Sequence, residues 1–101
     1  MGPLKHVVIT VIDGQVAVVP PRVVVSRKAQ EEVCVHSPQG EASIQFYSTP
    51  SESDTFLVPK GGSVAFGRAI GPNGIYKGAI IVRIPGDRRE GKSTLEVEVV
   101  D

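Results

Sequence analysis

The sequence lacks the residues on which several classes of protein depend. Cys34 is the one cysteine in 101 residues, so no disulfide can form within the chain, and the disulfide-rich secreted class is excluded. Lys and Arg together number 11, as do Asp and Glu. Nucleic acids and anionic membranes normally attract a basic surplus, and no apolar run approaches the roughly 18 residues of a membrane span. We therefore expect neither a nucleic acid nor a membrane as partner.

Residues that favour helices are also scarce. The chain has 3 Leu, 6 Ala and 1 Met against 17 Val and 8 Ile. β-Branched side chains lose rotamer freedom in a helix and pack well on a pleated sheet. The length of 101 residues falls within the usual size of one domain. The composition therefore predicts a single all-β domain over residues 1–101.

Short apolar segments alternate along the chain with turn residues. Asp13-Gly14 is a strong tight-turn pair, and Pro20-Pro21 should end a strand because proline cannot donate to a central ladder. Residues 42–48 and 94–100 alternate between apolar and polar side chains, and the apolar members are expected to face the core. The pattern predicts about seven to eight strands and no helix longer than a single turn.

The connections between the expected strands are short and polar. Such turns favour antiparallel pairing, because a parallel connection needs a crossover of about a dozen residues or more. We therefore predict an antiparallel Greek-key β-sandwich. Sandwich domains commonly carry function in the loops at their ends, and the candidates here are Thr49–Asp54 and Gly67–Gly74.

Several segments also follow one another in a characteristic order. Residues 16–25, with Pro20-Pro21 at their centre, precede Glu32-Val33-Cys34-Val35. Residues 56–62 and 74–78 come next, and residues 95–99 close the chain. This order resembles the cupredoxin-like family of β-sandwich domains. Immunoglobulin-like domains share much of the pattern, so the expected sandwich is cupredoxin-like or immunoglobulin-like.

The resemblance departs from the family at the place where copper would bind. Copper-binding members carry Cys, then His, then usually Met, in the loop after a Gly-x-Tyr strand. The corresponding residues 79–85 read Ala-Ile-Ile-Val-Arg-Ile-Pro and contain none of these ligands. A copper site of that kind needs a thiolate and two imidazoles. The resemblance therefore implies a member of the family without copper.

A nucleotide-binding pattern occurs near the end of the chain. Residues 86–93, Gly-Asp-Arg-Arg-Glu-Gly-Lys-Ser, satisfy the P-loop pattern Gly-x4-Gly-Lys-Ser. A P-loop cradles phosphates with backbone amides and with the N-terminus of a following helix. The residues after Ser93 alternate and are rich in valine, which predicts a strand in place of that helix. We therefore expect a polar hairpin turn and no bound nucleotide.

Three side chains could in principle ligate a transition metal. Cys34 and His36 are two residues apart in an expected strand and so share a face, and His6 is the other histidine. Their spacing lacks the compact pattern of zinc sites, and a free cysteine is more often a small buried apolar residue. We therefore expect no catalytic, cofactor-binding or metal-ligating residues, and no cofactor.

The function expected from the sequence follows by elimination. No nucleophile, base and orienting group converge, so we expect no enzyme. The leading hypothesis is a non-catalytic binding or accessory module whose partner is another protein or a second copy. Residues 42–47 carry no charge and no proline, and this strand would form the contact if it lies at a sheet edge. The alternative is a metal-binding (copper) or electron-transfer protein of the cupredoxin type, which requires Cys34 and His36 to be exposed together near His6.

Overall fold

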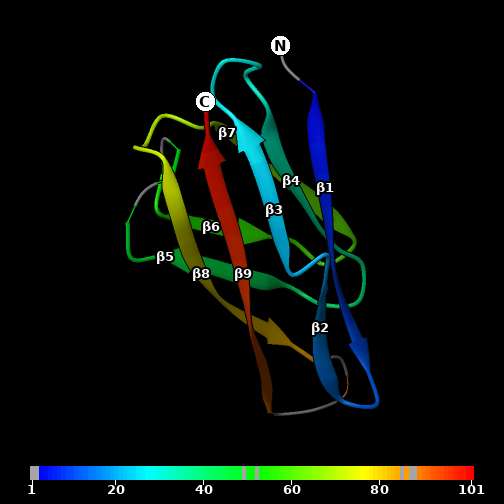
Figure 1. The fold of residues 1–101 in the computed structure, drawn as a ribbon. Coiled ribbons are helices and arrows are strands. Elements are labelled where there is room, and N and C mark those ends of the chain that lie inside the picture. The colour runs from blue at the N-terminus through cyan, green and yellow to red at the C-terminus, as the bar shows by residue number, and fades with distance from the viewer. Residues whose placement is uncertain (1–2, 49, 52, 85, 87–88) are drawn as a thin grey trace.

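The computed structural model describes residues 3–48, 50–51, 53–84, 86 and 89–101. Within these residues the chain forms nine strands and no helix, and the strands make two packed sheets (Figure 1). The predicted all-β sandwich is confirmed, with nine strands in place of about seven to eight. No helix in this part of the chain has the length and hydropathy needed to cross a membrane.

The nine strands divide between a four-stranded and a five-stranded sheet. Their bounds are β1 (Leu4–Ile12), β2 (Gln15–Val19), β3 (Arg22–Ser26), β4 (Glu32–Ser37), β5 (Ala42–Phe46), β6 (Thr55–Val58), β7 (Gly62–Arg68), β8 (Gly74–Arg83) and β9 (Glu90–Val100). The strand order is β2-β1-β4-β7 in the four-stranded sheet and β3-β9-β8-β5-β6 in the five-stranded sheet. Strands that follow one another in sequence therefore often belong to different layers.

Pro20 and Pro21 mark the place where the chain passes from one sheet to the other. Neither proline has an N–H to donate to a ladder, so the pairing of this segment with β1 stops there. β2 pairs with β1 up to Val8↔Val19, whereas β3 pairs with β9 from Arg22↔Glu96 onward. The predicted break at Pro20-Pro21 is confirmed. It separates β2, which belongs to the four-stranded sheet, from β3, which belongs to the five-stranded sheet.

Two of the seven described strand pairs are parallel, which differs from the antiparallel pairing expected throughout. β1 pairs parallel with β4, and β3 pairs parallel with β9. Residues 13–31 connect the first pair and residues 27–89 connect the second, so both connections exceed the dozen residues that a parallel pair needs. The argument from short turns applies only to strands that follow one another directly.

Each sheet turns one face to a shared core. In β9, the inward residues Leu95, Val97 and Val99 are at most 2% exposed, while Glu96 and Glu98 lie half-buried on the outer face. The same alternation holds in β5, where the apolar residues are buried. The inward and outward faces predicted for these two segments are confirmed.

Three phenylalanines join the two layers near the middle of the core. Phe46 and Phe56 come from the five-stranded sheet and Phe66 from the four-stranded sheet. The rings of Phe56 and Phe66 stack with centroids 4.1 Å apart, and Phe46 meets both of them edge to face. These are the arrangements that aromatic rings prefer, so the cluster fixes one packing of sheet on sheet.

β5 is an inner strand of the five-stranded sheet. It pairs with β6 from Ala42↔Val58 to Gln45↔Thr55, and with β8 from Ala42↔Val82 to Phe46↔Gly78. Both sides of its backbone are therefore occupied, and residues 42–46 offer no free edge to a partner. The condition under which this strand would form the partner contact is not met, and that hypothesis is withdrawn.

We predict that Leu95→Ala lowers the free energy of unfolding by about 2–5 kcal/mol, because it leaves a cavity in the core. Leu95 is 0% exposed. Leu57→Ala is the matched control, since Leu57 is 60% exposed on β6 and its loss should cost less than about 1 kcal/mol. Chemical denaturation of both variants measures the two values. Equal losses would contradict the inward face assigned to β9.

Candidate metal centre

β4 is an inner strand of the four-stranded sheet, and one of its faces packs into the core. Val33 and Val35 are 2% and 0% exposed and belong to that core. Successive side chains of a strand point to opposite faces of the sheet. Cys34 and His36 therefore lie together on the outer face, as their spacing predicted.

β1 brings His6 to the same place. The parallel register sets His6 opposite Cys34 and Val8 opposite His36. Residues that pair across neighbouring strands point to the same face, and Val7, which is 0% exposed, fixes the other face of β1 in the core. His6 therefore stands on the outer face beside both of the other side chains.

The three potential ligand atoms lie close together. Those of His6, Cys34 and His36 are all within 4.8 Å of one another. Nδ1 of His6 and Nε2 of His36 are 2.9 Å apart, a hydrogen bond in which one ring nitrogen donates and the other accepts. The two rings stack with centroids 5.2 Å apart and planes 29° apart.

The size of this cluster is close to that of a coordination sphere. A tetrahedral zinc ion has Zn–N distances of about 2.0–2.1 Å and Zn–S distances of about 2.3 Å, which separate its ligand atoms by roughly 3.3–3.7 Å. The two histidine nitrogens need to move apart by a few tenths of an ångström to reach that separation, and ligand atoms up to 4.8 Å apart need to approach by about an ångström. A bound ion would take the place of the proton that now lies between the two rings.

Exposure increases outward across the cluster. Cys34 is 8% exposed, His36 is half-buried and His6 is exposed. The residues beside them on β7 are small, since Ala65 lies opposite Cys34 and Ser63 lies opposite His36. An ion would therefore approach from the solvent side, with the thiol at the bottom of the site.

The donor types determine which ions fit. Thiolate and imidazole are ligands of zinc and copper, whereas magnesium and calcium prefer oxygen. Among the described residues, this is the one place where three His, Cys, Asp or Glu side chains converge. A tetrahedral ion held here would keep one position for solvent or for a donor from another molecule.

Sequence reasoning identified these three residues and placed Cys34 and His36 on one face, but it gave no reason to place His6 beside them. His6 and His36 are 30 residues apart, and the register of β1 with β4 joins them. A strand ladder is made of backbone groups that every sequence shares. The residues of one strand therefore do not identify the strand that pairs with it. The sequence offered only the alternation of polar His6 with apolar Val7, which indicates that His6 faces away from the core but does not identify its neighbours.

The P-loop pattern falls on a hairpin between β8 and β9. Asp87 and Arg88 lie outside the described residues. The strand expected from residue 94 is confirmed and begins earlier, at Glu90, and Lys92 pairs with Ile81 of β8. The backbone of residues 90–93 therefore belongs to a sheet, which is not the phosphate-wrapping conformation of a P-loop.

The segment that the cupredoxin resemblance placed at the copper loop is mostly strand. β8 extends through residues 79–83, with Ile80 and Val82 buried, and Pro85 lies outside the described residues. Arg83 at the end of β8 lies opposite Glu90 in the register, so an opposite charge faces it.

The two end loops proposed as binding loops contact each other. The carbonyl of Pro50 accepts hydrogen bonds from the N–H groups of Ile70 and Gly71, at 2.9 and 3.2 Å. Thr49 and Glu52 lie outside the described residues.

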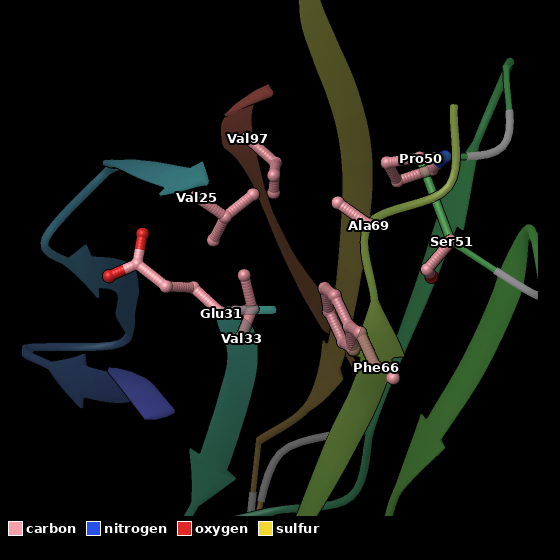
Figure 2. Close-up of a pocket in the computed structure, with 9 residues that line it drawn as sticks. Val25, Glu31, Val33, Pro50, Ser51, Phe66, Ala69 and Val97 are labelled. Carbon is pink, nitrogen blue, oxygen red and sulfur yellow. The ribbon is translucent and has the colours of Figure 1, made fainter. Parts of the chain in front are cut away.

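A small cavity lies beside these loops. Its volume is about 10 Å³, and it is lined by Val25, Glu31, Val33, Pro50, Ser51, Phe66, Gly67, Ala69 and Val97 (Figure 2). The carboxylate of Glu31 points away from the apolar lining in Figure 2, and it accepts the N–H of Ser26 at 2.7 Å and pairs with Lys5 at 3.4 Å. The space suffices for about one water molecule. This cavity is too small to hold an organic ligand.

Neither a protein-family model nor a curated protein matches the chain. The functional interpretation therefore rests on the geometry of the described residues.

We predict that ATP and GTP at millimolar concentration leave the amide NMR signals of residues 90–93 unchanged, because these residues pair with β8. Lys92→Ala should give the same spectra with and without nucleotide. A nucleotide-dependent shift that is present in the wild type and absent from Lys92→Ala would show that this segment binds phosphate.

Proposed function

We propose that this chain is a non-catalytic binding module that holds one transition-metal ion through His6, Cys34 and His36. The observation that carries the proposal is the convergence of three nitrogen and sulfur donors within 4.8 Å on one sheet face. It supports the alternative that the sequence left open in one respect, the proximity of Cys34 and His36 to His6, whereas the expected exposure of Cys34 is not met because this residue is 8% exposed. The loose spacing that argued against a metal site no longer does so, because the β1–β4 register supplies the proximity.

The donor set supports zinc or monovalent copper as the ion. A thiolate with two imidazoles suits both, and softer ligands favour these ions over magnesium, calcium or manganese. The buried thiol of Cys34 supports the same choice, because a metal ion stabilises the thiolate form where solvent is scarce. The number of ligands distinguishes the two ions. Zinc normally takes four ligands, so a zinc ion held by these three side chains would need a fourth ligand from solvent or from another molecule.

A catalytic use of Cys34 has little support. A cysteine nucleophile needs a base, a group that orients the base, and donors for the developing oxyanion. His36 lies two residues away on the same strand, and the backbone of β4 pairs with β1 on one side and β7 on the other. The neighbouring amides are therefore engaged in ladders, which supports a binding role.

We also propose a cupredoxin-like ancestry for the fold. The two sheets, and the passage of the chain between them at Pro20-Pro21, support it. In that family the copper ligands follow the Gly-x-Tyr strand, whereas the three donors here stand on β1 and β4. The proposed metal site is therefore a different one from that of the family.

Titration with Co²⁺, a spectroscopic substitute for Zn²⁺, tests the metal site. We predict one equivalent bound, with a thiolate-to-metal charge-transfer band that Cys34→Ser abolishes. His6→Gln and His36→Gln should each weaken the affinity by about tenfold or more, because each removes one of three ligands. Gln45→Ala, on the outer face of the other sheet, is the control and should bind as the wild type does.

The affinity for Co²⁺ should also fall as the pH is lowered, because the thiol and both imidazoles must be deprotonated to bind an ion. Competition with Zn²⁺ and Cu⁺ then ranks the ions. Melting temperatures of the ion-free variants show whether each one is folded. An unchanged affinity in folded Cys34→Ser would contradict the proposal.

A further inference from the structure

The outer face of the four-stranded sheet exposes large apolar side chains. Leu4, Val8, Ile12 and Val19 are 38% to 58% exposed and belong to β1 and β2. The three residues on β1 are four apart in sequence, so they share one face of the strand. Exposed apolar residues that stand singly are ordinary, whereas a contiguous group marks an interaction surface.

Val8 stands at the centre of this group. It lies opposite Val19 of β2 on one side and opposite His36 of β4 on the other. The next residues along this face are also uncharged, since Thr10 lies opposite Ala17. The apolar side chains therefore form one connected surface across neighbouring strands.

This surface carries no formal charge over most of its length. Glu32 and Arg68 lie opposite each other at one end, and Asp13 lies in the turn at the other end. Between them the outward-facing described residues of β1, β2, β4 and β7 include no Asp, Glu, Lys or Arg. Surfaces that remain in water usually carry such residues, so this face has the composition of a covered one.

The outer face of the five-stranded sheet provides the contrast. Lys77 of β8 lies opposite Glu96 of β9. Arg22 of β3 pairs with Glu96 at 3.4 Å and with Glu98 at 3.9 Å. This face also exposes Val24, Leu57, Ile75 and Ile81, but charged side chains of both signs stand among the apolar ones on β3, β8 and β9.

A second copy of this chain is the occupant that the charges favour. An uncharged face selects no oppositely charged partner, and copies of a chain with net charge zero do not repel one another at long range. A two-fold axis near Val8 would place apolar side chains of one copy on apolar side chains of the other. Each copy then contributes the same surface to the contact.

The size of the face sets the strength of such a contact. The four strands hold 27 residues, each of which covers about 3.3 Å along the strand and 4.8 Å across it, which gives roughly 430 Å² per copy and roughly 860 Å² in total. That total lies below the standard size of stable interfaces and in the range of weak, transient ones. The association should therefore be reversible and in the high-micromolar range.

We infer that two copies pack against each other through the outer faces of their four-stranded sheets, with Val8 at the centre. The inference goes beyond the proposed metal binding and does not rest on it. Sedimentation equilibrium of the full chain in the presence of a chelator tests it, over concentrations from about 1 to 500 μM. We expect a monomer–dimer equilibrium in that range.

Matched substitutions locate the interface. Val8→Glu should weaken the dimer by more than about tenfold, because it places a charge in an apolar contact. Val24→Glu is the control, since Val24 is 45% exposed on the outer face of the other sheet, and it should leave the dimer unchanged. Val19→Glu, at a position 57% exposed, provides a second test at the sheet edge should Val8→Glu fail to fold.

Each outcome decides the inference. A dimer that is lost in Val8→Glu or Val19→Glu and kept in Val24→Glu supports it. A wild type that stays monomeric at every concentration overturns it, and so does a dimer that folded Val8→Glu and Val19→Glu leave intact. The chelator removes metal from every sample, so a monomer refutes the dimer while the Co²⁺ titration decides metal binding separately.

Discussion

The parallel pairing of β1 with β4 is the interaction on which the rest of the structure depends. Between β1 and β4 the chain leaves the four-stranded sheet after β2 and joins the edge of the other layer as β3. Pro20 and Pro21 make that departure possible, because neither can continue a ladder. The same pairing sets His6 opposite Cys34. The pairing of β1 with β4 therefore accompanies the division of the chain into two layers, and it brings the possible metal ligands of His6, Cys34 and His36 together from distant parts of the chain.

The two outer faces differ in their charge. The five-stranded sheet carries paired charges among its exposed apolar side chains, whereas the four-stranded sheet is uncharged between its two ends and carries two imidazoles and a thiol. An ion held by three donors keeps a position open on that face. The proposed ion and the proposed second copy thus share one surface, and two ligands on one surface are thermodynamically linked.

The glycines of the P-loop pattern have structural roles that require no phosphate. Gly86 has φ +77°, a left-handed conformation that favours glycine in a turn. A Cβ on Gly91 would lie 2.2 Å from Cγ2 of Val16, so the close approach of β9 to β2 requires glycine there. Lys92 and Ser93 follow in the strand. A sequence can thus match the P-loop pattern although its two glycines are needed for other reasons, namely a turn at Gly86 and a close approach of strands at Gly91.

The sequence by itself determined which segments are strands, where they break and, in two of them, which side faces the core. Those properties are local, because alternation in 42–46 and 94–100 and the two prolines act through residues that are adjacent in the chain. Only the tertiary structure decided which strands pair. β5 became an inner strand although its sequence resembles an unprotected edge, and His6 joined Cys34 and His36 across 30 residues. The physical reason is that strands are connected by backbone hydrogen bonds, which are the same for every residue but proline. The packing of the two layers against each other therefore selects which strands pair.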